Sequence, residues 1–263
     1  MPNGFDILAE GVGKAVKTVP EVYEDGLKPA TKESGKTIAL IPRAINAALV
    51  PLRQWIAVRE YNIAETEKLL SEKLEHVGQD KIVTSEPYVA IPAIQAISYS
   101  MNSEELRNLY ANLLTKSMIN DSKNSVHPSF VEIIKQMSPL DATVFQMIMK
   151  AKTRPLITLN KQLKSGGSII LQRHCSWVNE LSVRQFSTSI DSLIRLGLIE
   201  IPYGEYYNID ATYNAVKQNP LFKTLEHANS ILLENGEKLE YDKQYIKIND
   251  LSSLFYEICV VNP

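Results

Sequence analysis

Two helix starts lie close together between Val126 and Ala151, and the patterning of the chain differs on their two sides. Pro128 suits the first turn of a helix, where its missing N–H would have no partner in any case. At Ser138-Pro139-Leu140-Asp141 the serine can cap, the proline can take the first helical position, and the aspartate faces the positive end of the dipole. These signals predict a short helix ending near Met137 and a second helix beginning directly after it.

The clearest helix before this boundary begins near Asn102, which is expected to cap it. Glu104 and Glu105 follow in the first turn, where carboxylates complement the helix dipole. Apolar residues then recur at intervals of three and four, at Leu106, Leu109, Tyr110, Leu113, Leu114 and Met118. This spacing predicts one buried stripe along the helix.

The rest of the first half also has helical spacing and no convincing alternation of apolar and polar residues. Asn62, with Glu65 three residues later, predicts a capped helix start. A helix rich in alanine and isoleucine is expected at 87–100. Residues 1–137 are therefore predicted to be all-helical, with 1–60 as a candidate semi-independent segment.

Residues after the boundary show a mixed pattern. The segments 156–159 and 168–172 flank a Ser-Gly-Gly turn and predict a β-hairpin. Ser182 followed by Gln185 is the pattern of a capping box. The helix that follows is expected to bury Phe186, Ile190, Leu193, Ile194 and Leu196. Gly197 suits the left-handed conformation that ends such a helix.

A hairpin is expected directly after this helix, with strands at 198–201 and 205–207. A capped helix that breaks into a hairpin in this order is typical of a winged helix-turn-helix. A helix starting at Asn219-Pro220 and a last strand at 243–248 follow, and Asp250 is expected to cap a final helix.

The predicted fold is thus mainly α: an N-terminal helical region followed by a winged-helix-like α+β domain. That domain covers residues 138–263 and carries an insertion near 208–240.

Charge is distributed unevenly over the winged-helix-like domain. Between Lys150 and Arg195 there are eight basic and two acidic residues, whereas five basic and ten acidic residues lie between Glu200 and Pro263. A local excess of positive charge favours contacts with phosphates. The candidate nucleic-acid-binding residues are Lys161, Lys164, Arg173, Arg184, Ser187, Thr188 and Arg195.

Protein contacts through the same domain are the favoured alternative, because the expected wing tip carries Glu205 where DNA-binding wings usually have a cation. The net charge of −2 likewise provides no general attraction to nucleic acid or anionic lipid. The partner is therefore expected to be nucleic acid or a protein, and assembly of the chain into a homo-oligomer is a further alternative.

No pattern in the chain predicts an enzyme, a metal site or a cofactor. The four histidines lack ligand-type spacing, and His174 and Cys175 are adjacent, where neighbouring side chains usually point apart. Cys175 and Cys259 are expected to be free thiols. A hydrolase whose site leaves no sequence signal is a weaker alternative.

The segment from Thr37 to Val58 supports a different hypothesis. Its apolar residues and arginines could lie on a membrane surface, with candidate contacts at Ile41, Arg43, Leu49, Arg53 and Trp55. Pro42 and Pro51 would interrupt such a helix, so a segment buried within the protein is favoured. The N-terminus lacks the pattern of a signal peptide, and the protein is expected in the cytoplasm.

Several stretches resemble one known family, abortive infection alpha (Abi-alpha), a bacterial domain of largely unknown function. The resemblance is carried by 86–118 (EPYVAIPAIQAISYSMNSEELRNLYANLLTKSM), 126–142 (VHPSFVEIIKQMSPLDA), 23–29, 41–49, 195–201 and 245–259. It implies a role in bacterial defence against phage. It carries over no catalytic residue.

Overall fold

A computed structural model describes residues 65–97, 100 and 102–263. The predictions for residues 1–64, including the Asn62 cap, lie outside these residues. The described chain divides into two compact units. The first contains residues up to Asn102 together with Tyr110–Val131 and Pro263, and the second contains Ser103–Leu109 and Glu132–Asn262.

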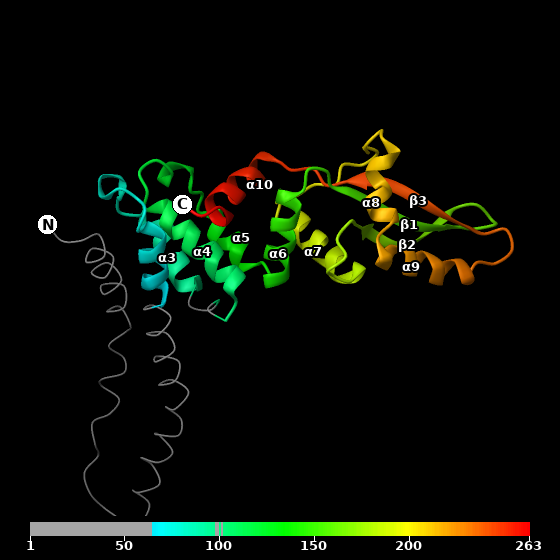
Figure 1. Ribbon diagram of the computed structural model, residues 1–263, viewed down its shortest axis with the longest axis horizontal. Helices are drawn as coiled ribbons and strands as arrows, with labels where there is room; N and C mark the ends of the chain where they lie inside the picture. Colours follow the sequence, from blue (N-terminus) through cyan, green and yellow to red (C-terminus); the bar gives the residue numbers. More distant parts are fainter. Residues whose placement is uncertain (1–64, 98–99, 101) are drawn as a thin grey trace, which may run out of the picture. The chain divides into compact units, whose positions relative to one another are not determined.

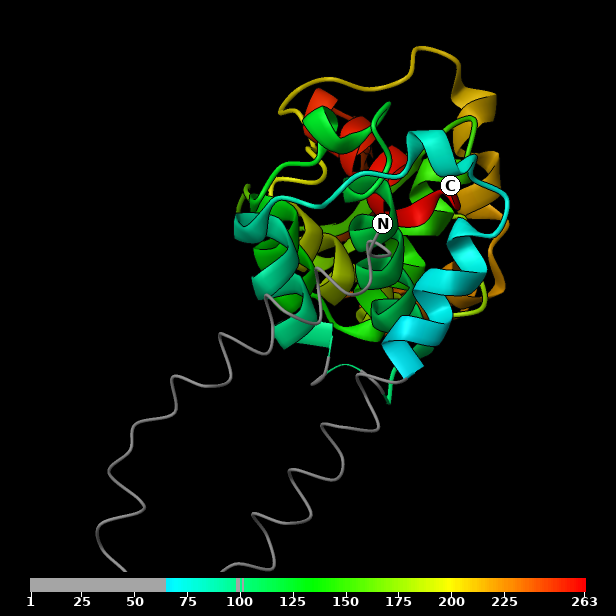
Figure 2. The same cartoon turned by 90° about the vertical axis from the view of Figure 1, so that its left-hand side faces the viewer.

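The first unit is helical, as expected from its spacing. Its elements are a helix at 65–74, η3 (Gln79–Lys81), α3 (Pro87–Ile97), the part of α4 (Glu104–Ser117) from Tyr110, η4 (Lys123–Ser125) and the start of α5 (Ser129–Lys135). In Figure 2 the segment that connects the helix at 65–74 to α3 runs across this unit. An isolated bridge between Ile82 and Ile119 and an ion pair of Lys81 with Asp121 at 2.9 Å hold this connecting segment.

Two helix starts show how local polar contacts set the boundaries. The Oγ of Ser103 accepts a hydrogen bond from the Leu106 amide at 3.3 Å, so the cap of α4 is Ser103 and the expected Asn102 cap is wrong by one residue. His127 Nδ1 accepts from the Ser129 amide at 3.1 Å at the start of α5. His127 is therefore a helix-start residue.

The second unit combines helices with one small sheet. Its elements are α6 (Pro139–Lys150), β1 (Pro155–Gln162), β2 (Ser168–Cys175), α7 (Val183–Arg195), η5 (Asp210–Tyr213), α8 (Asn214–Lys217), α9 (Pro220–Ile231), β3 (Lys238–Tyr245), α10 (Asp250–Phe255) and a π-helical turn (Tyr256–Val260). The sheet is antiparallel with the order β2-β1-β3 (Figure 1). The described chain is thus mainly helical with a small three-stranded sheet.

Capping residues start α6 and α7 where the sequence indicated. Ser138 and Asp141 form a capping box at α6, and Ser182 and Gln185 form one at α7. Gly197 ends α7 with a φ of 72°, which a residue with a Cβ rarely adopts.

Two details of the C-terminal helices differ from expectation. Ile194 is 38% exposed and does not belong to the inner face of α7. Asn249 caps α10, and the prediction of Asp250 is wrong by one residue, because the Asn249 side chain accepts from the Ser252 amide at 2.8 Å.

The hairpin expected after α7 is not formed in the described residues. Glu200 makes an isolated bridge with Lys247, and residues 205–207 are outside any strand. The Tyr207 amide donates to the Tyr213 hydroxyl at 3.0 Å instead of to a strand partner. The strand that completes the sheet is β3, which begins at Lys238 and pairs with β1 along its whole length.

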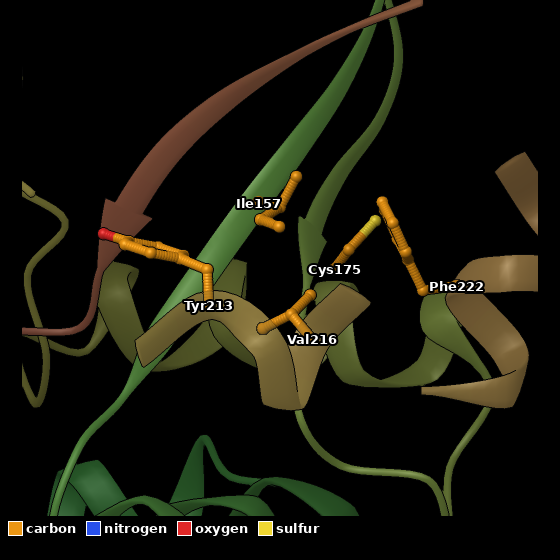
Figure 3. Close-up of a cluster of buried hydrophobic side chains, with 5 residues drawn as sticks. All are labelled: Ile157, Cys175, Tyr213, Val216 and Phe222. Carbon is orange, nitrogen blue, oxygen red and sulfur yellow. The ribbon is translucent and has the colours of Figure 1, made fainter. Parts of the chain in front are cut away.

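The segment expected to be an insertion supplies part of the core. Tyr213, Val216 and Phe222, from η5, α8 and α9, pack against Ile157 of β1 and Cys175 of β2 (Figure 3). All five side chains are at most 2% exposed. The segment therefore covers one face of the sheet, and these three side chains are buried against β1 and β2.

Candidate functional site

The exposed face of α7 gathers three of the predicted site residues. Arg184, Thr188 and Arg195 are exposed, and so is Asp191 between them. The four residues recur at intervals of four, three and four, which places them on one side of a helix. We call these four residues the α7 stripe.

Side-chain hydrogen bonds connect helix α7 to residues before and at the start of α6. The Ser192 hydroxyl donates to Asp141 Oδ2 at 3.0 Å, which ties the helix to the start of α6. Arg195 Nη1 donates to Gln136 Oε1 at 2.8 Å. The Thr188 hydroxyl donates to the Arg184 carbonyl at 2.9 Å within the helix. The α7 stripe is thus presented by a helix whose C-terminal part is tied to residues outside it.

Ser187 was expected to face outward, and the structure corrects this. Its side chain is buried, with 9% exposure, and its Oγ lies 3.3 Å from His174 Nδ1. The cause is on β2, where two strand irregularities shift the pairing with β1 and His174 adopts a φ of 55°. β-bulges redirect side chains in this way, and here His174 contacts α7.

The two lysines of the β1–β2 hairpin have acidic partners. Lys161 Nζ lies 3.2 Å from Glu237 Oε2, and Lys164 Nζ lies 3.8 Å from Glu234 Oε2. Arg173 lies on β2, and its side chain is exposed. The hairpin therefore offers less uncompensated positive charge than the sequence count suggested.

His174 brings Ser187 and Asp191 together, although sequence reasoning gave no role to this trio. Nδ1 of His174 is 3.3 Å from Ser187 Oγ and 3.7 Å from Asp191 Oδ1. A hydrolase triad needs the serine and the acid on different ring nitrogens, so that the imidazole relays a proton while held in one tautomer. Both partners here face the same nitrogen, so the trio is a structural contact. No local signal could reveal it, because the bulge that turns His174 inward depends on the pairing with β1.

Cys175 and His174 point in different directions. Figure 3 shows the Cys175 side chain within the core cluster, whereas His174 contacts α7. Burial raises the pKa of the Cys175 thiol to about 12 and raises that of Cys259 well above its usual value. A nucleophilic cysteine reacts as the thiolate, which such a pKa suppresses near neutral pH. These cysteines are therefore core residues.

The described part of the chain contains no group of three or more His, Cys, Asp or Glu side chains that could hold a metal ion. Among the same residues, no helix is both long enough and apolar enough to cross a membrane. The candidate membrane contacts Ile41, Arg43, Leu49, Arg53 and Trp55 lie outside the described residues.

Folding stability is expected to depend on the protonation of His174. Burial lowers the pKa of His174, and Arg173 acts in the same direction, while Asp191 and Ser187 oppose the shift. The folded protein therefore binds this proton less readily than the unfolded chain. The free energy of unfolding should fall as the pH drops below the ordinary histidine pKa of about 6.5.

Urea unfolding measured between about pH 8 and pH 5 tests this expectation. His174→Asn should lose this part of the pH dependence, and asparagine tolerates a positive φ. An identical pH dependence in the parent and the variant would contradict the assignment to His174.

Comparison with known proteins gives a family match over most of the chain. The model of the family described as "Abortive infection alpha" matches residues 58–259. No curated protein matches. One solved structure, an uncharacterized protein from the hydrocarbon-degrading marine bacterium Alcanivorax borkumensis SK2, is similar at 14% identity with a TM-score of 0.33. It aligns with 50% of this chain and 92% of its own, and a likeness of this strength supports no argument about fold or function.

Proposed function

The chain belongs to the abortive infection alpha family, and from this premise we propose that it acts in bacterial abortive infection as a non-enzymatic factor. In this proposal α7 is the contact helix of the second unit, and the α7 stripe engages a macromolecular partner. The observation that carries the proposal is the row of exposed polar residues Arg184, Thr188, Asp191 and Arg195 on a helix that hydrogen bonds anchor at Ser192 and Arg195.

A protein partner fits the α7 stripe better than a nucleic acid. Binding a duplex requires several cations that neutralise phosphates. Asp191 lies between the two arginines of the stripe, and Lys161 and Lys164 are paired with glutamates. A polypeptide surface that carries both charges can complement this arrangement, and arginine is enriched in protein interfaces.

The test is a phage challenge of bacteria that express the full chain. We expect fewer plaques than with an empty vector for at least one phage of a panel. The double variant Arg184→Glu plus Arg195→Glu should lose this protection. The matched control Lys217→Glu plus Lys223→Glu reverses two exposed lysines of α8 and α9 and should keep it. Protection that survives the arginine variant would overturn the role of the stripe.

Two further measurements separate the alternatives. Salt-dependent binding of a short DNA or RNA duplex that is lost in the arginine variant would assign the stripe to nucleic acid. Dye release from anionic liposomes that depends on residues 1–58 would favour a membrane-perturbing effector. We expect neither result for the purified full chain.

A further inference from the structure

The loop between α7 and η5 exposes two tyrosines and an isoleucine. Tyr203 is fully exposed and Tyr206 is 55% exposed, and Ile209 at the end of the loop is 69% exposed. Exposed apolar groups that gather in one place usually mark a contact site. The loop lies apart from the α7 stripe in the sequence and contributes none of its residues.

This loop and the end of β3 border an open surface pocket of about 500 Å³, lined by Gly204, Glu205, Tyr206, Tyr207, Asn208 and Tyr245. Pockets for small ligands commonly have volumes of about 300–1,000 Å³. Three of the six lining residues are tyrosines and one is a carboxylate. Gly204 makes the turn with a φ of 74° and has open space where a Cβ would stand.

Tyr207 and Tyr245 form an aromatic wall of the pocket, and contacts within the protein hold them in place. The rings of Tyr207 and Tyr245 lie 5.1 Å apart between centroids and at 47° to each other. The Tyr207 hydroxyl accepts from the Arg154 amide at 3.2 Å, and its own amide donates to Tyr213. The Tyr213 hydroxyl in turn donates to the Gln244 carbonyl at 3.1 Å. Contacts within the protein therefore position Tyr207 and Tyr245 without a ligand.

The charge around the pocket is negative. The Tyr245 hydroxyl donates to Glu205 Oε2 at 2.8 Å, which positions this carboxylate at the wall. The hydrogen bond to Glu205 raises the pKa of Tyr245, with smaller contributions in the same direction from burial, Tyr207 and Glu200. The nearby Lys243 is bound to Asp210 at 2.5 Å. An anion would therefore be repelled here, whereas a cation would find a carboxylate and ring faces.

We propose that this pocket binds the alkylammonium group of an organic cation. Ring faces attract cations through their negative quadrupole, and tyrosine walls with a carboxylate suit a large, weakly hydrated ammonium. The protein already contains one such contact, because Lys243 Nζ lies 5.8 Å from the centre of the Tyr213 ring. Two sources can supply the group: a free amine or a lysine side chain of a polypeptide.

The test titrates the purified full chain with three probes by isothermal calorimetry and saturation-transfer NMR. Choline stands for a free quaternary amine, and Nα-acetyl-lysine methylamide stands for a lysine side chain. The third probe, 3,3-dimethylbutan-1-ol, has the shape of choline without its charge. We expect a cation to bind with a Kd on the order of 1 mM and the neutral probe to bind at least about ten times more weakly. Whichever cation binds more tightly identifies the source.

Substitutions place the binding in this pocket. Glu205→Gln keeps the size of the side chain, Tyr206→Ala removes a wall, and each should weaken cation binding by about five-fold or more. Tyr206→Phe keeps the ring and should retain binding. Tyr203→Ala removes an exposed tyrosine that does not line the pocket and should change nothing.

Three results would overturn the proposal: no binding of either cation, equal binding of the neutral probe, or binding that Glu205→Gln leaves unchanged. Circular dichroism of each variant separates a local effect from a loss of folding. Because the α7 stripe shares no residue with the pocket, failure of the phage challenge and failure of this titration are distinct outcomes.

Discussion

Replacing Phe222 with alanine is expected to lower the free energy of unfolding by about 3–5 kcal/mol. Phe222 is 2% exposed and lies in the cluster that α9, α8 and η5 build on the sheet (Figure 3). Removing its ring takes away buried apolar area and leaves a cavity against Cys175 and the neighbouring side chains, and both effects destabilise the fold. The ring also lies 6.0 Å from that of Tyr241 on β3, a contact that alanine cannot make.

Urea unfolding followed by circular dichroism measures this change. The matched control is Ile231→Ala, at the other end of α9, where the side chain is 69% exposed. It should change the free energy of unfolding by no more than about 0.5 kcal/mol. If the two substitutions had similar effects, the segment 208–240 would not be part of the core that the structure assigns to it.

Replacing Asp141 with alanine is expected to lower the free energy of unfolding by about 2–4 kcal/mol, as the sum of two losses. Its carboxylate accepts from the Ser138 amide at 2.9 Å and from the Ser192 hydroxyl at 3.0 Å. Losing the first bond weakens the start of α6, and losing the second leaves a partly buried hydroxyl on α7 without this acceptor. Asp141 itself is only 5% exposed, so water cannot easily replace either bond.

Ser192→Ala separates the two contributions, because it removes only the bond between α6 and α7. The double variant completes a mutant cycle, and the coupling between the two positions should exceed about 0.5 kcal/mol, as for residues in direct contact. Additive effects would show that Asp141 acts through the helix start alone. Because this bond also holds the helix that carries the α7 stripe, both variants are informative in the phage challenge.

Helix starts were predictable because their signals are local. At Ser138 and Ser182 a side chain binds a backbone amide three residues away, and the bond needs no other part of the chain. The same holds for Asn219, whose side chain accepts from the Leu221 amide at 2.9 Å before Pro220 opens α9. The hairpin of β1 and β2 was also predictable, since its strands are joined by a short turn with Gly166 and Gly167 at positive φ.

Pairing between distant segments was not predictable in the same way. Strand-like residues at 198–201 and 205–207 suggested a hairpin, yet Glu200 meets Lys247 and β3 completes the sheet. Strand propensity describes a residue that fits a half-buried pleated surface, and it does not choose the partner strand. The choice follows from which apolar side chains can be buried together, and that depends on the path of the segment 208–240.

The candidate site shows the same division. Arg184, Thr188 and Arg195 could be placed on an exposed helix face from spacing alone, whereas the burial of Ser187 depended on the bulge that turns His174 inward. The pocket at Tyr206 had one signal, the density of tyrosines between residues 203 and 207, but its wall requires Tyr245 from a strand nearly forty residues later.

The sequence by itself determined where most helices begin, that Arg184, Thr188 and Arg195 of α7 face solvent, and the family to which the chain belongs. Capping bonds, helical spacing and a continuous motif are all contained within a few neighbouring residues. Only the tertiary structure decided which strand pairs with β1, which charges of the hairpin are neutralised, and which tyrosines share a pocket. Those contacts join residues far apart in the chain, and they form only where burial of the shared apolar core brings the segments together.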